Sequence, residues 1–163
     1  MLPVELDGAR RRYSPPHEIV LVPPCVGEGV QVPTLHAAGN ISLLERTAVA
    51  VGGSRFASDE ERKLGAAVAR ELVAMGLVVV SGLAAGIDGV AHRAAIAAGR
   101  RTIAVVGTPL ERALPREHAR LHEAIYRDHL VVSASSRGAD LFGSGFDGLG
   151  AQLSIPPGTG PPS

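Results

Sequence analysis

Four apolar runs recur through the middle of the chain, and each gives way to small or polar residues. Valine, isoleucine and alanine dominate these runs, which have the length of buried strands and lie at 47–51, 77–81, 102–106 and 130–133. The segments between them show the three-to-four-residue spacing of helices. Strands that alternate with helices predict an α/β protein built on a parallel sheet.

The first helical segment has clear start and stop signals. Ser58 can cap its N-terminus while Glu61 bonds back, which is a capping box, and Gly76 suits the left-handed residue after the last turn. We expect the buried stripe of this helix to consist of its large apolar residues at helical spacing: Leu64, Val68, Leu72 and Met75.

The other two helices are predicted from Asp88, as N-cap, to Gly99, and from Pro115 at the first helical position to about residue 128. Right-handed crossovers place the carboxyl ends of successive parallel strands at one edge of the sheet. We therefore predict a three-layer, Rossmann-like parallel sheet flanked by helices. The sequence leaves the strand order open.

Composition divides the chain into three parts. Residues 1–34 form a proline-rich N-terminal arm with one short strand candidate at 18–22 and a basic triplet at 10–12. Residues 35–133 form the core, and the apolar piece 41–44 is expected to pack under it. Residues 134–163 are dense in glycine, serine and proline, and we expect an irregular tail.

The overall charge does not indicate a polyanion partner, because 16 basic and 16 acidic residues give a formal net charge of zero. All basic residues except Lys63 are arginines. Arginine suits contacts in which two N–H groups bind one phosphate, but a GC-rich codon bias gives the same composition. The single cysteine, Cys25, cannot form an intrachain disulfide. With no signal-peptide-like or membrane-length apolar run, we expect a cytoplasmic protein without membrane contact.

Small-residue loops follow three of the predicted strands, at 52–55, 82–86 and 107–109. Backbone N–H groups and a helix N-terminus that meet at one edge of a sheet attract anions. We therefore predict a phosphate-binding edge. The candidate binding residues are Gly53, Ser54, Arg55, Ser81, Gly82, Gly86, Arg93, Gly107, Thr108 and Arg116.

Several of these residues also have structural interpretations. Arg55 can fork onto a phosphate or lie on the surface as a helix-cap contact. Ser81 can bind a phosphate or satisfy the local backbone, and a nucleophile elbow is absent because Val79 stands where the first glycine is required. Asp88 and His92, one turn apart, could pair as an acid–base couple or only structurally.

His118 and His122 form an H-x-x-x-H pair, but the glutamate of the metalloprotease motif is missing and no third ligand has suitable spacing. We predict no metal and no cofactor.

Three runs, TAVAVGGSR, VVSGLAAGIDGVAHRAAI and TIAVVGTPLERALPREHARL, resemble the Rossmann-like domain of the DNA-processing protein family, DprA/Smf, over residues 35–133. The resemblance implies a non-enzymatic protein that binds single-stranded DNA, assists a recombinase in natural transformation, and dimerises. It maps the family's DNA-binding arginine to Arg55. Further motif positions match Ser54, Ser81, Gly82, Gly86, Asp88 and His92, and Arg93 and Arg116 fall where basic residues are often found.

The chain departs from this family in two places. Gly52-Gly53 replaces the usual Val-Gly, and the family's F-P-x-R-N-R segment does not follow the P-P-G-T at 156–159, so we expect a divergent or truncated member. Two other functions remain open: a pocket for a nucleotide or its derivative, and a degenerate protein-interaction scaffold. Among the few aromatic residues, Phe56 is the best candidate for stacking on a base.

Overall fold

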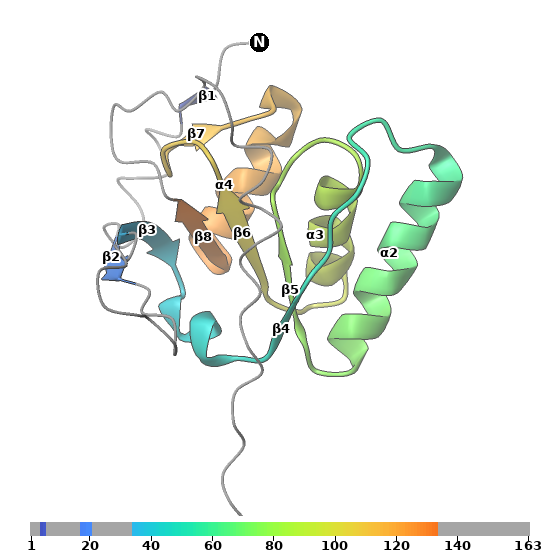
Figure 1. Ribbon diagram of the computed structural model, residues 1–163, viewed down its shortest axis with the longest axis horizontal. Helices are drawn as coiled ribbons and strands as arrows, with labels where there is room; N and C mark the ends of the chain where they lie inside the picture. Colours follow the sequence, from blue (N-terminus) through green and yellow to red (C-terminus); the bar gives the residue numbers. More distant parts are fainter. Residues whose placement is uncertain (1–3, 6–16, 21–33, 134–163) are drawn as a thin grey trace, which may run out of the picture.

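The computed structural model describes residues 4–5, 17–20 and 34–133, and a six-stranded sheet organises this part of the chain (Figure 1). The basic triplet at 10–12, Cys25 and the tail at 134–163 lie outside the described residues. The strand order in the sheet is β2-β3-β8-β6-β5-β4. A separate two-stranded sheet pairs β1 with β7.

The strands are β1 (Val4–Glu5), β2 (His17–Val20), β3 (Thr34–Gly39), β4 (Ala48–Ala50), β5 (Val78–Ser81), β6 (Thr102–Val106), β7 (Arg112–Ala113) and β8 (Leu130–Ser133). The α-helices are α2 (Asp59–Ala74), α3 (Ile87–Ala97) and α4 (Ala119–Asp128). Two short 3-10 helices, η1 (Ile41–Glu45) and η2 (Arg116–His118), complete the set.

The parallel core of the sheet confirms the predicted fold class. β4, β5, β6 and β8 pair in parallel, and α2, α3 and α4 connect them in turn. The strand at 102–106 and the strand at 130–133 have the predicted bounds. Because all four strands run in one direction, their carboxyl ends share one edge, to which we refer below as the carboxyl edge.

β3 was missed in the sequence, although it pairs antiparallel with β8 on one side and with β2 on the other. Its residues, TLHAAG, include only one large apolar side chain and no run of β-branched residues. The strand exists because β8 offers it a pairing edge, which no local pattern shows. β2 comes from the segment predicted as an N-terminal arm, and β3 crosses the predicted boundary at residue 34.

The two faces of the sheet have different covers. Val79 packs with Ala69 and Val73 of α2 and with the alanines of α3, and Ala104 and Val131 pack with α4. Val78 and Val80 point the other way, into a cluster with Leu43 of η1. The three α-helices therefore lie on one face, and η1 packs on the other, as expected for the apolar piece at 41–44.

The predicted buried stripe of α2 is wrong. Leu64 is 66% exposed, Val68 is 43% exposed and Met75 is 74% exposed, while Leu72 is half-buried. The buried residues are Gly65, Ala69 and Val73, the neighbouring row about 100° further round the helix. A Cβ on Gly65 would lie 3.2 Å from Ile87 Cδ1, so α2 approaches α3 closely and only small side chains fit between them.

Two helix starts also differ from the prediction. α3 begins at Ile87 after the N-cap Gly86, so Asp88 lies within the first turn and is not the cap. Pro115 precedes η2, and α4 begins only at Ala119, because the chain makes a 3-10 turn before the α-helix. By contrast, the capping box of Ser58 and Glu61 forms as predicted, with both reciprocal hydrogen bonds.

Candidate functional site

The loop after β4 rests on the N-terminus of α3 at the carboxyl edge. The carbonyl of Ser54 accepts a hydrogen bond from the Ile87 amide at 3.2 Å. Gly86 has φ +77°, and a Cβ there would lie 2.1 Å from the Ser54 carbonyl oxygen. A Cβ on Gly53 would lie 2.8 Å from Ile87 Cγ1. Glycines at 53 and 86 thus allow the two loops to touch.

The amides of the loop after β5 are occupied by a carboxylate of the same chain. Asp88 Oδ2 accepts from the Gly82 amide at 3.1 Å and from the Ala84 amide at 3.4 Å. These are the donors that a bound phosphate would use in a Rossmann-type loop. Asp88 therefore satisfies the loop internally, whereas the hydrogen-bond partner of His92 is Thr102.

The predicted hydroxyl contacts are also engaged within the protein. Ser81 is buried, and its hydroxyl donates to the Val51 carbonyl at 2.6 Å. Thr108 is buried, and its hydroxyl donates to the Arg112 carbonyl at 3.0 Å. The Ser81 hydroxyl therefore makes the backbone contact named as one of its two roles, and its role as a phosphate contact stays a prediction. Gly107, the residue before Thr108, is half-buried.

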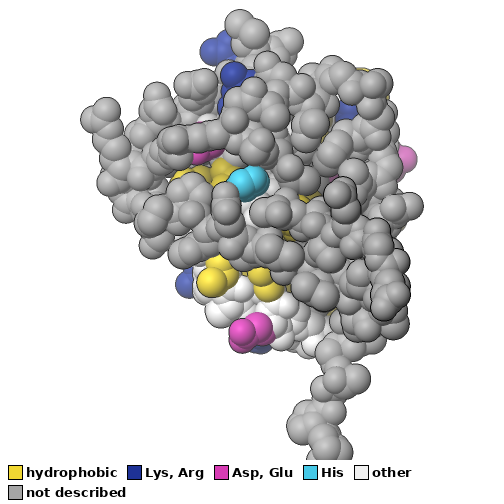
Figure 2. Space-filling view, turned by 60° about the vertical axis from the view of Figure 1, so that its left-hand side comes forward, with side chains coloured by type: hydrophobic (Ala, Val, Ile, Leu, Met, Phe, Trp, Pro, Cys, Tyr) yellow, Lys and Arg dark blue, Asp and Glu magenta, His cyan; other side chains and the backbone are white. Residues whose placement is uncertain are grey.

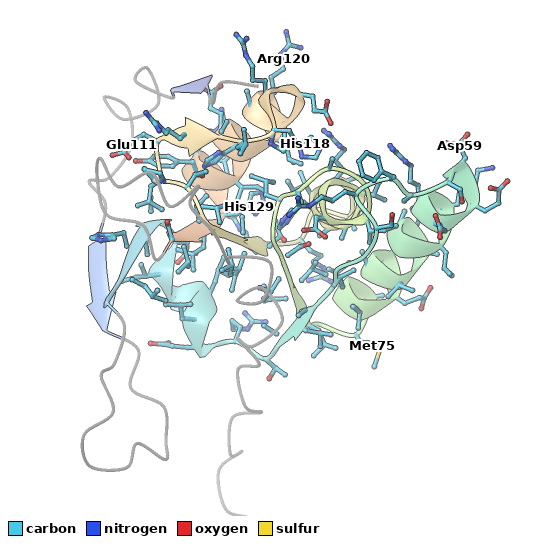
Figure 3. The ribbon with its side chains drawn as sticks, turned by 45° about the horizontal axis from the view of Figure 1, so that its top comes forward. Asp59, Met75, Glu111, His118, Arg120 and His129 are labelled. Carbon is cyan, nitrogen blue, oxygen red and sulfur yellow. The ribbon has the colours of Figure 1, made fainter. Side chains whose placement is uncertain are left out.

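η2 is fixed to the same edge through His118. Its Nδ1 lies 3.0 Å from the carbonyl oxygen of Leu83. The backbone of Leu83 has a left-handed φ of +60°. Its ring packs against Gly89 of α3, where a Cβ would lie 2.3 Å from His118 Cε1. Sequence reasoning missed this contact, although a glycine in the first turn of α3 is a signal of close approach. Figure 3 shows His118 directed toward α3.

Cationic side chains surround the packed loops. Arg55 follows Ser54 and is exposed, and Arg116 and Arg120 are exposed on η2 and at the start of α4. Figure 3 shows Arg120 extending from the carboxyl edge. Arg93 is exposed, and its backbone lies six residues along α3 from Ile87, about 9 Å down the helix axis from this edge.

The remaining polar side chains beneath the edge are structural. The Thr102 hydroxyl donates to the Val79 carbonyl at 2.7 Å, so its oxygen accepts at 2.8 Å from Nδ1–H of His92. Burial lowers the pKa of His92 to about 3 and the pKa of His122 to about 4. Both rings are therefore neutral at pH 7, and neither is an acid–base candidate there.

Figure 2 views the molecule from the side nearer β2 and β3. Figure 2 shows a mixture of hydrophobic, basic, acidic and histidine groups among the described side chains in view.

Two further searches concern only the part of the chain that the structure describes. It contains no cluster of three or more histidine, cysteine or acidic residues placed to hold a metal ion. Nor does any helix in it have the length and apolar character needed to cross a membrane.

These features define a Rossmann-like α/β domain. At its carboxyl edge the loops after β4 and β5 pack against each other, and exposed arginine side chains lie near them. A family model for "DNA recombination-mediator protein A" matches residues 27–146, so the chain belongs to that family. This agrees with the resemblance noted from the three sequence motifs.

Curated relatives include DNA processing protein DprA of Streptococcus pneumoniae, which is 46% identical over 99 residues, covering 58% of this chain and 33% of that protein. Protein Smf of Escherichia coli is 41% identical over 87 residues, covering 53% of this chain and 23% of that protein. The chain thus matches a third or less of the length of these two relatives.

Solved structures agree with the fold. The X-ray structure of DprA from S. pneumoniae has a TM-score of 0.66 at 36% identity, over 80% of this chain and 47% of that chain. A structure of DNA processing protein A from Helicobacter pylori, whose title describes a single-stranded DNA binding mode, has a TM-score of 0.65 at 25% identity, over 76% of this chain and 57% of that chain.

Proposed function

We propose that this chain binds single-stranded DNA along its carboxyl edge and acts in DNA processing as a binding protein, with no reaction of its own. The observation that carries the proposal is the exposed Arg55, which follows a loop packed on the N-terminus of α3. Exposed Arg116 lies in η2 at the same edge. Support also comes from the H. pylori relative, whose title describes single-stranded DNA binding.

Side chains, and not the loop amides, are expected to hold the phosphates. Asp88 already occupies the amides of Gly82 and Ala84, so an additional anion there would meet a carboxylate. Guanidinium groups bind phosphate oxygens through paired N–H donors. Because the net charge of the chain is zero, binding depends on this local cluster and should weaken with salt.

The test is a fluorescence-anisotropy titration of a labelled 20-nucleotide thymidine strand at several salt concentrations. Arg55→Ala and Arg116→Ala should each weaken binding about threefold to tenfold and reduce the salt slope by about 0.7 per lost phosphate contact. Arg100→Ala is the matched control, because Arg100 is exposed just before β6, at the opposite edge of the sheet. Unchanged affinity of Arg55→Ala at low salt contradicts the proposal.

The same proposal includes two partners implied by the family: a recombinase that is assisted onto DNA, and a second copy of the chain. The description of the family as a recombination mediator supports the first. Sedimentation velocity with and without the thymidine strand tests the second, and recombinase filament formation on protein-coated DNA tests the first. A monomer at all concentrations would remove dimerisation from the proposal.

A further inference from the structure

Phe56 is an aromatic side chain on the outside of the protein. Its exposed fraction is 95%, the largest among the exposed large hydrophobic residues of the described chain. Tyr126, the other aromatic residue described, is 1% exposed in the core. A phenylalanine stabilises a fold when it is buried, so one presented almost fully to water contributes little to the stability of this domain.

The backbone on both sides of Phe56 is fixed. Its amide donates to Ser54 Oγ at 3.1 Å, and the Ser54 carbonyl in turn accepts from the Ile87 amide. On the other side Ala57 is 7% exposed, and its carbonyl accepts from Arg62 Nε at 3.0 Å. The ring is therefore carried by an anchored turn, which lowers the entropy lost when it binds a partner.

Charges near this turn are divided between two sides. The first turn of α2 holds three acidic residues, Asp59, Glu60 and Glu61, which disfavour a phosphate beside them, while Arg62 on the same side is held against the Ala57 carbonyl. Arg55 precedes the ring, and Arg116 and Arg120 belong to the part of the edge beyond α3. A single-stranded nucleic acid that crosses the carboxyl edge would therefore place its phosphates toward the arginines and one of its bases over the ring of Phe56.

We propose that Phe56 is a base-stacking residue, on whose ring one base of a single-stranded nucleic acid lies while Arg55 contacts a neighbouring phosphate. An aromatic ring beside a guanidinium suits a nucleotide, because one group takes the flat base and the other the charged backbone. This inference rests on the proposed function and adds a contact to the bases. Stacking of this kind tolerates any base, so it predicts affinity without sequence specificity.

The chain contains no tryptophan, so Phe56→Trp introduces a single fluorescent reporter at the position of the ring. Titration with the 20-nucleotide thymidine strand should quench its emission, whereas an abasic strand of equal length should not. Met75→Trp is the matched control, because Met75 is 74% exposed at the far end of α2 (Figure 3). Its emission should stay constant with both strands.

Phe56→Leu keeps an apolar side chain but removes the aromatic ring. It should weaken binding of the thymidine strand by roughly fivefold to a hundredfold and leave binding of the abasic strand unchanged. The melting temperature should not move, because the side chain is exposed.

Equal affinity of Phe56→Leu and the parent protein for the thymidine strand overturns the stacking inference, as does equal quenching of Phe56→Trp by both strands. If Arg55→Ala still weakens binding in that case, the proposed function stands without the stacking contact. If the parent protein binds neither strand at low salt, the proposed function and this inference both fail.

Discussion

The carboxylate of Asp88 accepts a hydrogen bond from the amide of Gly82 at 3.1 Å, across the loop that joins β5 to α3. A negative charge of the protein thus stands where a Rossmann-type loop would hold a phosphate of a nucleotide. This relationship argues against the nucleotide-pocket alternative. It also explains why the candidate DNA contacts are arginine side chains outside the loop.

Removal of this carboxylate should expose an anion site. Asp88→Ala leaves the amides of Gly82 and Ala84 without their acceptor and should lower the free energy of unfolding by about 1–2 kcal/mol. Inorganic phosphate should then raise the melting temperature of the variant more than that of the parent, because it can replace the lost acceptor. Differential scanning fluorimetry over a phosphate series measures this, with exposed Asp59→Ala as the control. Equal phosphate responses of parent and Asp88→Ala would contradict the assignment.

Gly86 should be required for the contact between the two loops. Gly86→Ala places a Cβ against the Ser54 carbonyl, whereas Gly76→Ala has a similar φ of +82° but nothing within 4 Å. Both variants carry the cost of a left-handed alanine, about 1–2 kcal/mol. Only Gly86→Ala should lose further stability and weaken DNA binding, as urea denaturation and the anisotropy titration would show. Equal losses in both variants would mean that the loop contact contributes nothing.

The orientation of α2 can be tested by truncation on its two faces. Val73 is 2% exposed, so Val73→Ala should lower the free energy of unfolding by about 1–3 kcal/mol. Met75 is 74% exposed, and Met75→Ala should change it by less than about 0.5 kcal/mol. Urea denaturation measures both. A larger loss of unfolding free energy in Met75→Ala than in Val73→Ala would mean that the face of α2 predicted from the sequence is the buried one.

The buried histidines should make the fold sensitive to acid. Burial lowers the pKa of His92 to about 3 and that of His122 to about 4, from 6.5 in an exposed ring. At a pH between 6.5 and the lowered pKa, the unfolded chain binds a proton at each histidine that the folded chain does not bind. The free energy of unfolding is therefore greatest above pH 6.5 and falls as the pH decreases. Each histidine should contribute a slope of about 1.4 kcal/mol per pH unit in that range.

Denaturation in urea at pH 7.0, 5.5 and 4.5 measures this dependence. His122→Leu keeps an apolar side chain of similar size and should remove the contribution of one histidine to the slope. A slope that is the same in the parent and the variant would show that His122 does not titrate with unfolding.

Local sequence was sufficient for the parallel part of the fold. The apolar runs at 102–106 and 130–133 became strands with those bounds, and the capping box of Ser58 and Glu61 formed as predicted. Each of these features depends on residues within one run or one helical turn. The parallel direction of the strands then placed the loops after β4, β5 and β6 at one edge without any knowledge of strand order.

The tertiary structure alone decided which groups at that edge are available to a ligand. Ser81, Thr108 and the Gly82 amide are all polar groups in small-residue loops, and the sequence predicts them as phosphate contacts. In the fold their partners are Val51, Arg112 and Asp88, which reach them across loop and strand boundaries. The Ser81 bond joins residues 30 apart in the sequence, and the other two depend on how each loop bends, so the strand and helix periodicities of the chain do not reveal them.

The same distinction holds for α2. The sequence determined that residues 59–74 form a helix, since periodicity and capping are local properties. It did not determine which face turns inward, because the row of Leu64, Val68 and Leu72 lies beside the row of Gly65, Ala69 and Val73, about 100° away around the helix axis. The close approach of α3 at Gly65 leaves no room for a large side chain there, so the shape of the neighbouring helix decided which of the two rows is buried.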